Sequence, residues 1–249
     1  MIYTIMFSSS ETIDRLNQTN QLGKLSLEMV FTDASARPSI VGYNCSGGVF
    51  MIFSDSQNRG YGLAMNTGWW LLTADSCKRT IRNILDDHGI SYSSHVDDLT
   101  YITAISEMFA VDYALRWIKQ NKDYIIIEND VHIVTDAKAI VVSCQNSGSP
   151  YYCPRDSDLR QFIALESNIH SYDYDFIITY EHIRAHQYDD YSIIDVLDMD
   201  LKAFGNRVAD NVADIRKDFQ MNIWDYNFPK RNRHKYCEYS SNPRPYWSI

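Results

Sequence analysis

The sequence predicts a mixed α/β domain, because segments with the two-residue period of a β-strand alternate with segments that have helical spacing. The first strand-like segment covers residues 25–35, where apolar side chains from Leu25 to Phe31 occupy alternate positions. The clearest helical segment covers residues 104–120, where apolar residues recur at helical spacing. The chain has 249 residues, 45% of them apolar, which is enough to bury a sizeable core.

Three antiparallel strands are expected to open the domain. The strand from Leu25 runs directly into Asp33, and two more strands are expected over 47–55 and 60–68, joined by the turn-forming segment DSQNRG. Residues 1–24 are weakly patterned after the first seven, so they are expected to be an N-terminal extension. The first strand therefore places a carboxylate at its end.

An inserted segment and a helix occupy the middle of the chain. Residues 68–103 have the character of an insertion, with one helix expected over 74–89 that ends at Gly89. In the helix over 104–120, Glu107 lies at the border of the apolar stripe rather than opposite it. We therefore expect the Glu107 carboxylate to face the sheet.

Two further strands follow this helix. Residues 130–142 indicate a buried strand that ends at Asp136 and turns directly into a helix, and residues 173–183 indicate another strand shortly before His186. An acidic insertion over 187–202 comes next. Two roles remain open for it, covering a site or shaping a substrate groove.

An amphipathic helix and a basic tail end the sequence. The apolar stripe of the helix runs from Phe204 to Phe219, with Asp210 and Asp214 on its other face. The tail over 222–249 is locally basic. A nucleic-acid contact and a solubilising end are both compatible with this tail.

Composition excludes several classes of protein. Lys and Arg number 23 against 32 Asp and Glu, and a net charge of −9 argues against a protein that holds nucleic acid by bulk charge. The five cysteines are scattered and contain no C-x-x-C pair, which indicates neither a disulfide framework nor a zinc site and favours an intracellular location, in cytoplasm or nucleus. No apolar run is long enough to span a bilayer, so no membrane association is expected.

Four carboxylate-bearing fragments follow one another along the chain: FTDAS with Asp33, SEMFAVDYAL with Glu107, IVTDAKAIV with Asp136 and GNRVADNVAD with Asp210. In this order they resemble the motifs of the ribonuclease H family. A fifth fragment, EHIRAHQ, resembles the family segment that ends in a catalytic histidine, here His186. The resemblance spans roughly residues 27–214 and implies a ribonuclease H-like five-stranded mixed sheet flanked by helices on both faces, in a domain over 25–221.

The resemblance implies hydrolysis of phosphodiester bonds with two Mg²⁺ or Mn²⁺ ions as cofactors. Asp33 and Asp136 would be the central ligands, Glu107 and Asp210 would complete one ion each, and His186 would move protons or assist product release. A physical reason supports this set, because converging carboxylates repel one another unless cations lie between them. Such ions take oxygen ligands together with substrate phosphate.

Residues implied to contact substrate are Ser35, Asn44 and Asn206. Residues 36–43 have the character of an insertion before NCSGG, which is similar to a glycine-rich turn of the family and supplies Asn44. Ahead of Glu107 the sequence has TAIS, whereas family members usually place Asn or Gln there to meet the 2′-hydroxyls of RNA. The resemblance therefore does not extend to the position by which the family distinguishes RNA from DNA.

The favoured expectation is cleavage of the RNA strand of RNA–DNA hybrids, with nucleic acid as the partner. A DNA-directed nuclease such as a junction resolvase, and a catalytically silent nucleic-acid or protein-binding scaffold, remain alternatives. Asp214 remains an alternative to Asp210 as fourth ligand. Structural explanations also stand for single residues, since Asp33 is typical of a turn, Glu107 of a helix start and Asp136 of a helix cap.

Overall fold

The computed structural model describes residues 3–7, 25–56, 60–73, 98–145, 174–188 and 190–214, with 75, 79 and 83 as isolated positions. Most of the helix expected over 74–89 lies outside the described residues, as does the basic tail over 222–249. The same holds for residues 8–24 of the N-terminal extension and for the final helix beyond Asp214.

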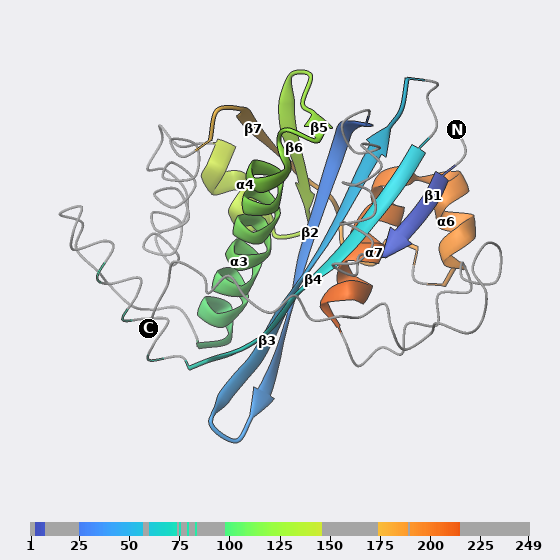
Figure 1. Cartoon of the computed structure of the whole chain (residues 1–249). Coiled ribbons are helices and arrows are strands. Elements are labelled where there is room, and N and C mark those ends of the chain that lie inside the picture. Colours follow the sequence, from blue (N-terminus) through green and yellow to red (C-terminus); the bar gives the residue numbers. More distant parts are fainter. Residues whose placement is uncertain are drawn as a thin grey trace.

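A mixed sheet forms the centre of the described structure (Figure 1). Its strands are β1 (Tyr3–Phe7), β2 (Leu25–Ser39), β3 (Gly42–Ser54), β4 (Gly60–Leu72), β5 (Ile125–Ile126), β6 (Asp130–Thr135) and β7 (Ile177–His182). Their order is β1-β4-β3-β2-β6-β7, with β5 paired to β2. Strands β2, β3 and β4 are antiparallel, as the sequence predicted, whereas β6 and β7 continue the sheet in parallel.

The sheet has seven strands among the described residues, rather than the five expected. The two additional strands are short: β1 pairs in parallel with β4 at one edge, and β5 pairs with Leu25 and Ser26 at the start of β2. Segments of five and two residues are too short to show a periodic pattern in the sequence. The path β4-β3-β2-β6-β7 supplies the expected five-stranded mixed sheet.

Strands β2 and β3 form a long hairpin that extends well beyond the helices (Figure 1). Residues 36–43, expected as an insertion, instead continue both strands around a turn at Ile40 and Val41. The segment NCSGG lies inside β3 rather than in a turn, which corrects the expectation from sequence. Most of the outer hairpin is half-buried or exposed, so it lacks the apolar alternation that marks a strand in sequence.

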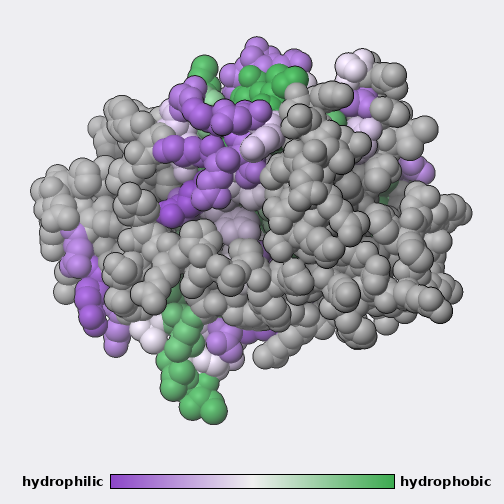
Figure 2. Space-filling view, viewed as in Figure 1, coloured by the Kyte–Doolittle hydropathy of each residue, from purple (hydrophilic) through white to green (hydrophobic). Residues whose placement is uncertain are grey.

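The tip of this hairpin is apolar. Ile40 and Val41 are 104% and 66% exposed, and the tip forms the hydrophobic projection at the bottom of the view in Figure 2.

Helices cover both faces of the sheet, as expected. On one face lie α3 (Asp98–Asn121) and α4 (Lys138–Gln145), and their core includes Val30 of β2. On the other face lie α6 (Ile193–Met199) and α7 (Leu201–Ala213), whose core includes Phe31. Adjacent residues Val30 and Phe31 serve opposite cores because successive strand side chains point to opposite faces.

The acidic insertion over 187–202 contains α6, a helix that the sequence analysis did not predict. Its N-cap is Ser192, whose side chain accepts a hydrogen bond from the backbone N–H of Asp195 at 3.2 Å. Ile193 and Val196 are buried in the core of the α7 face. Part of this segment therefore completes the core.

Among the described helices, none is long and apolar enough to cross a membrane.

Candidate metal centre

Strands β2 and β6 bring Asp33 and Asp136 together. These strands are parallel and pair Thr32 with Thr135, so the residue that follows each of them lies at the same level of the sheet. Asp33 is only 7% exposed although it is a carboxylate, and Asp136 is half-buried. Buried carboxylates are rare unless they are paired or bind metal, which makes this position a candidate site.

Helix α3 adds Glu107 to this pair. Glu107 is 5% exposed, and its Oε1 accepts a hydrogen bond from the backbone N–H of Ala34 at 3.2 Å. The same N–H also donates to Asp33 Oδ1, at 2.6 Å. One carboxylate oxygen from each of Asp33, Glu107 and Asp136 lies within 4.8 Å of the other two. The Glu107 carboxylate therefore faces the sheet, as the sequence predicted.

Two adjacent glycines in β3 let both helices approach the sheet closely. A Cβ atom on Gly47 would lie 2.9 Å from the Ala110 Cβ of α3, and one on Gly48 would lie 2.0 Å from the Ala209 carbonyl oxygen of α7. Gly48 is also the β3 residue that pairs with Asp33. Because successive strand residues face opposite sides, the glycine pair provides one contact point for each helix.

These contact points lie beside the acidic residues of the two helices. Ala110 is three residues after Glu107 on α3, and Ala209 directly precedes Asp210 on α7. The close packing at β3 therefore carries both carboxylates toward Asp33.

Replacing Gly48 with Ala is expected to lower the free energy of unfolding by about 2–4 kcal/mol, because the new methyl group would meet backbone. The same change at Gly47 is expected to cost about 1–2 kcal/mol, since its nearest contacts are methyl groups of Ala110 and Thr67 at 2.9 Å. Urea unfolding of both variants measures the difference. Equal losses would contradict the close backbone approach of α7.

Burial and mutual repulsion raise the pKa values of the acidic cluster. The pKa of Asp33 is raised well above its ordinary value, first by burial and then by the charges of Asp136 and Asp210. The pKa of Glu107 is raised in the same way, by burial and then by Asp33 and Asp136. Without a counter-ion, the ionised cluster therefore destabilises the fold.

Asp136 differs because polar neighbours oppose the effect of burial. Burial raises its pKa, a hydrogen bond from Asn206 lowers it, Asp210 raises it, and the charges of His186 and His182 lower it. The bond from Asn206 Nδ2 to Asp136 Oδ2 is long, at 3.5 Å. Asp136 is thus the carboxylate that joins the buried cluster to the more exposed side of the site.

The donor set fits a hard divalent cation. Within the described part of the chain, Glu107 Oε2 and Asn206 Oδ1 are buried oxygen atoms that accept no hydrogen bond. Mg²⁺ and Mn²⁺ bind carboxylate and amide oxygens, and a bound cation would offset the repulsion among the carboxylates. The acidic cluster of Asp33, Glu107 and Asp136 is therefore a site that a metal ion would stabilise.

A small pocket opens beside the cluster. It is lined by Asp136, Arg184, His186, Gln187, Tyr188, Val196, Ala203, Asn206, Arg207 and Asp210. His186 is exposed and has a φ of 55°, a left-handed conformation that non-glycine residues adopt rarely. Arg207 of α7 donates hydrogen bonds to the carbonyls of Tyr188 and Tyr191 at 3.0 and 2.7 Å. Helix α7 thereby holds the loop that follows His186.

The remaining predicted site residues lie in different surroundings. Asp214 is buried and forms an ion pair with Arg37 of β2. Ser35 pairs with Ser46, two positions along the hairpin from the Asp33–Gly48 pair. Asn44 pairs with Arg37, so it lies roughly 14 Å along the strand from Gly48 at about 3.4 Å per residue.

The structure thus gathers six of the residues predicted from sequence around one pocket and cluster: Asp33, Glu107, Asp136, His186, Asn206 and Asp210. It does not bring Asn44 to them. Sequence reasoning missed Arg207, for which its place three residues before Asp210 on one helix was an available signal. It also missed Arg37, whose partner is 177 residues away in the chain.

The fold and the site together define an α/β protein with an acidic cluster at the end of a parallel strand pair. No family model matches the sequence. No curated protein matches it either.

Several solved structures are similar to this chain. RNase H1 from the halophilic archaeon Halobacterium salinarum is 9% identical, with 76% of this chain and 98% of that chain covered and a TM-score of 0.38. LC11-RNase H1, solved with an RNA/DNA hybrid, is 13% identical, with 66% and 88% covered and a TM-score of 0.34. The PFV RNase H domain is 17% identical, with 78% and 94% covered and a TM-score of 0.35. Because these sequence identities and TM-scores are low, the functional conclusion rests on the residues of the site alone.

Proposed function

We propose that the protein is a metal-dependent endonuclease that hydrolyses phosphodiester bonds, with the RNA strand of RNA–DNA hybrids as its substrate. One observation carries this proposal: three carboxylates from separate elements converge in a buried cluster within 4.8 Å. The raised pKa values of Asp33 and Glu107 support it, because the cluster is costly to the fold unless it binds cations.

Four carboxylates would hold the metal. Asp33 and Asp136 would be the central ligands, Glu107 would complete one ion, and Asp210 would complete the second. When bound, two Mg²⁺ or Mn²⁺ ions supply charge stabilisation to the attacking and leaving oxygens of an in-line displacement. The Ala34 N–H orients the cluster, since it donates to both Asp33 and Glu107.

The pocket beside Asp136 is suited to the leaving-group side of the reaction. His186 lies on its rim, close enough to lower the pKa of Asp136, and an imidazole there can deliver a proton to the leaving oxygen. Arg184 lines the same pocket and is exposed, so its guanidinium can bind a substrate phosphate. Asn206 holds the Asp136 carboxylate in place.

A second candidate is a DNA-directed nuclease of the same architecture. The Ser106 hydroxyl is buried and donates to the Ile102 carbonyl at 2.7 Å, so the residue before Glu107 offers no donor toward a substrate. Discrimination of RNA from DNA depends on contacts to the 2′-hydroxyl. This position gives no support for such a contact, which favours a DNA substrate.

Cleavage assays with Mg²⁺ or Mn²⁺ separate the candidates. We expect cutting of a labelled RNA–DNA hybrid, and no cutting of duplex DNA or of a four-way DNA junction. Asp136→Asn should remove the activity, whereas Asp123→Asn, which changes an exposed carboxylate, should keep it. Cutting of the junction alone would favour the second candidate. Binding without cutting of any substrate would instead indicate a silent scaffold.

A further inference from the structure

The last turn of α7 is attached to three neighbouring strands. Arg37 of β2 forms an ion pair with Asp214, the C-cap of the helix. Ser46 of β3 donates a hydrogen bond to the carbonyl of Ala213. Asn66 of β4 donates through Nδ2 to the carbonyl of Val212 at 2.7 Å. Three consecutive residues at the end of the helix are thus each held by a different strand.

The Arg37–Asp214 ion pair differs from the two other attachments because both partners are charged. The side chain of Asp214 is 9% exposed, and a negative charge at a helix C-terminus is unfavourable beside the helix dipole. The guanidinium of Arg37 offsets this charge. Asp214 is therefore engaged with Arg37, which argues against its assignment as the fourth metal ligand.

The turn held by this ion pair begins at Asp210. The backbone N–H of Asp214 donates to the Asp210 carbonyl at 3.0 Å, so the two residues lie one helical turn apart. Ala209, just before Asp210, packs against Gly48, which pairs with Asp33. The orientation of this single turn therefore sets where the Asp210 carboxylate lies relative to Asp33.

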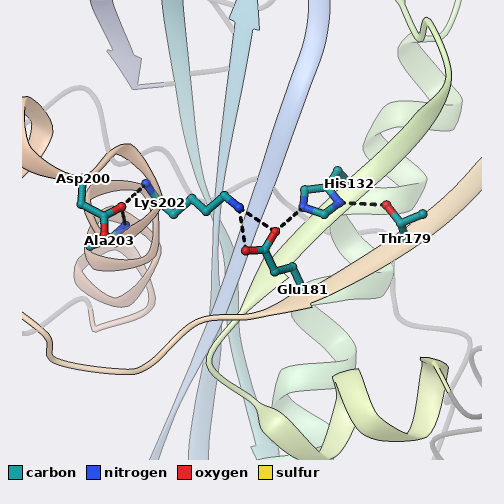
Figure 3. A network of polar contacts seen from close by, with 6 residues as sticks. All are labelled: His132, Thr179, Glu181, Asp200, Lys202 and Ala203. Carbon is teal, nitrogen blue, oxygen red and sulfur yellow. Dashed lines mark hydrogen bonds and ion pairs between the residues drawn. The ribbon is translucent and has the colours of Figure 1, made fainter.

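The opposite end of α7 is attached in a different way. Lys202 Nζ donates to both carboxylate oxygens of Glu181 at 2.6 and 2.7 Å, and Asp200 caps the helix (Figure 3). His132 bonds the same carboxylate at 2.9 Å. Glu181 and Lys202 are 35% and 43% exposed. This ion pair lies about two turns from Asp210, so it provides a matched comparison within one helix.

We propose that Arg37 and Asp214 are positioning residues, whose ion pair fixes the last turn of α7 against the sheet and so holds Asp210 at the metal centre. This inference rests on the proposed function, because it assigns Asp210 a metal. The residues act through Asp210 and do not bind metal themselves.

Calorimetric titration of the full chain with Mn²⁺, without nucleic acid, tests this inference. We expect Arg37→Ala and Asp214→Asn each to weaken binding of one Mn²⁺ equivalent by about 10-fold or more, the range found for groups that orient metal ligands. Arg37→Lys should recover part of the loss, because it keeps the charge. Lys202→Met, which breaks the ion pair at the other end, should lower the melting temperature and leave Mn²⁺ binding unchanged.

Cleavage kinetics provide a second readout. For Arg37→Ala the Mg²⁺ concentration at half-maximal rate should rise by about the same factor, with the KM for nucleic acid unchanged. Unchanged Mn²⁺ binding in Asp214→Asn, with a lower melting temperature only, would overturn the positioning role. Loss of a Mn²⁺ equivalent in Asp214→Asn but not in Arg37→Ala would make Asp214 a ligand and also overturn it. Wild-type protein that binds no Mn²⁺ would instead overturn the metal centre, and the positioning role with it.

Discussion

Asp33→Asn is expected to abolish cleavage and at the same time to stabilise the metal-free protein. Asn keeps the shape of Asp and an oxygen that accepts the Ala34 N–H, but it removes a buried charge whose pKa is raised by burial and by Asp136. The cleavage rate should fall by about 10³-fold or more, which corresponds to about 4 kcal/mol of transition-state stabilisation.

In the absence of metal, the melting temperature of Asp33→Asn should be higher than that of the wild type, because the variant lacks a charge that burial and Asp136 make unfavourable. Single-turnover cleavage and thermal unfolding in EDTA measure the two effects. Asp123→Asn is the matched comparison, because its carboxylate is exposed and should change neither quantity. A fall in metal-free stability for Asp33→Asn would show that the carboxylate is structural, as in a turn.

The second large effect concerns the response of stability to pH and metal. Asp33, Glu107 and Asp136 all have raised pKa values in the folded protein. The folded state therefore binds more protons than the unfolded state at pH values above the ordinary carboxyl pKa of about 4. The stabilisation that comes from protonating these three carboxylates is fully present below that pH. It is lost as the pH rises through their pKa values in the folded protein.

In EDTA, the melting temperature should therefore rise as the pH is lowered from about 8 to about 5. Saturating Mg²⁺ should reverse this trend, because the ions bind the deprotonated carboxylates; at 100 times its dissociation constant a ligand adds about 2.7 kcal/mol. Thermal unfolding across this pH range, with EDTA or with Mg²⁺, measures both effects. The pKa of Glu181 is lowered, mainly by Lys202, so its contribution is lost only below about pH 4 and does not interfere.

A double variant with Asp33→Asn and Glu107→Gln supplies the control for this experiment. It should flatten the pH dependence in EDTA and remove most of the stabilisation by Mg²⁺. A wild-type melting temperature that falls steadily from pH 8 to pH 5 in EDTA would contradict the repulsion within the cluster.

Much of the fold could be predicted because its main elements are strongly periodic. The strand that contains Asp33, the helix of Glu107 and the strand before Asp136 all form where the apolar pattern places them. Two boundaries differ from the prediction: β2 continues past Asp33 to Ser39, and α3 begins at Asp98 rather than at residue 104. The outer hairpin and β1 could not be recognised in this way. The hairpin residues are largely half-buried or exposed, and β1 spans only five residues.

The arrangement of the site was predicted less completely than its members. The order of the acidic motifs indicated which residues would meet, and the register of β2 with β6 places Asp33 beside Asp136. Neither the ion pair of Arg37 with Asp214 nor the packing at Gly48 has a local signal, because each joins segments more than 150 residues apart. Such contacts arise from tertiary structure alone.

The glycine pair in β3 has a consequence for protein engineering. Gly47 and Gly48 contact α3 and α7 from opposite faces of one strand, so both helices pack against the same two residues. Transplanting only the acidic side chains into another scaffold would leave their spacing undefined. A functional graft would have to carry this dipeptide, so that the distance between the helices is inherited together with the chemistry.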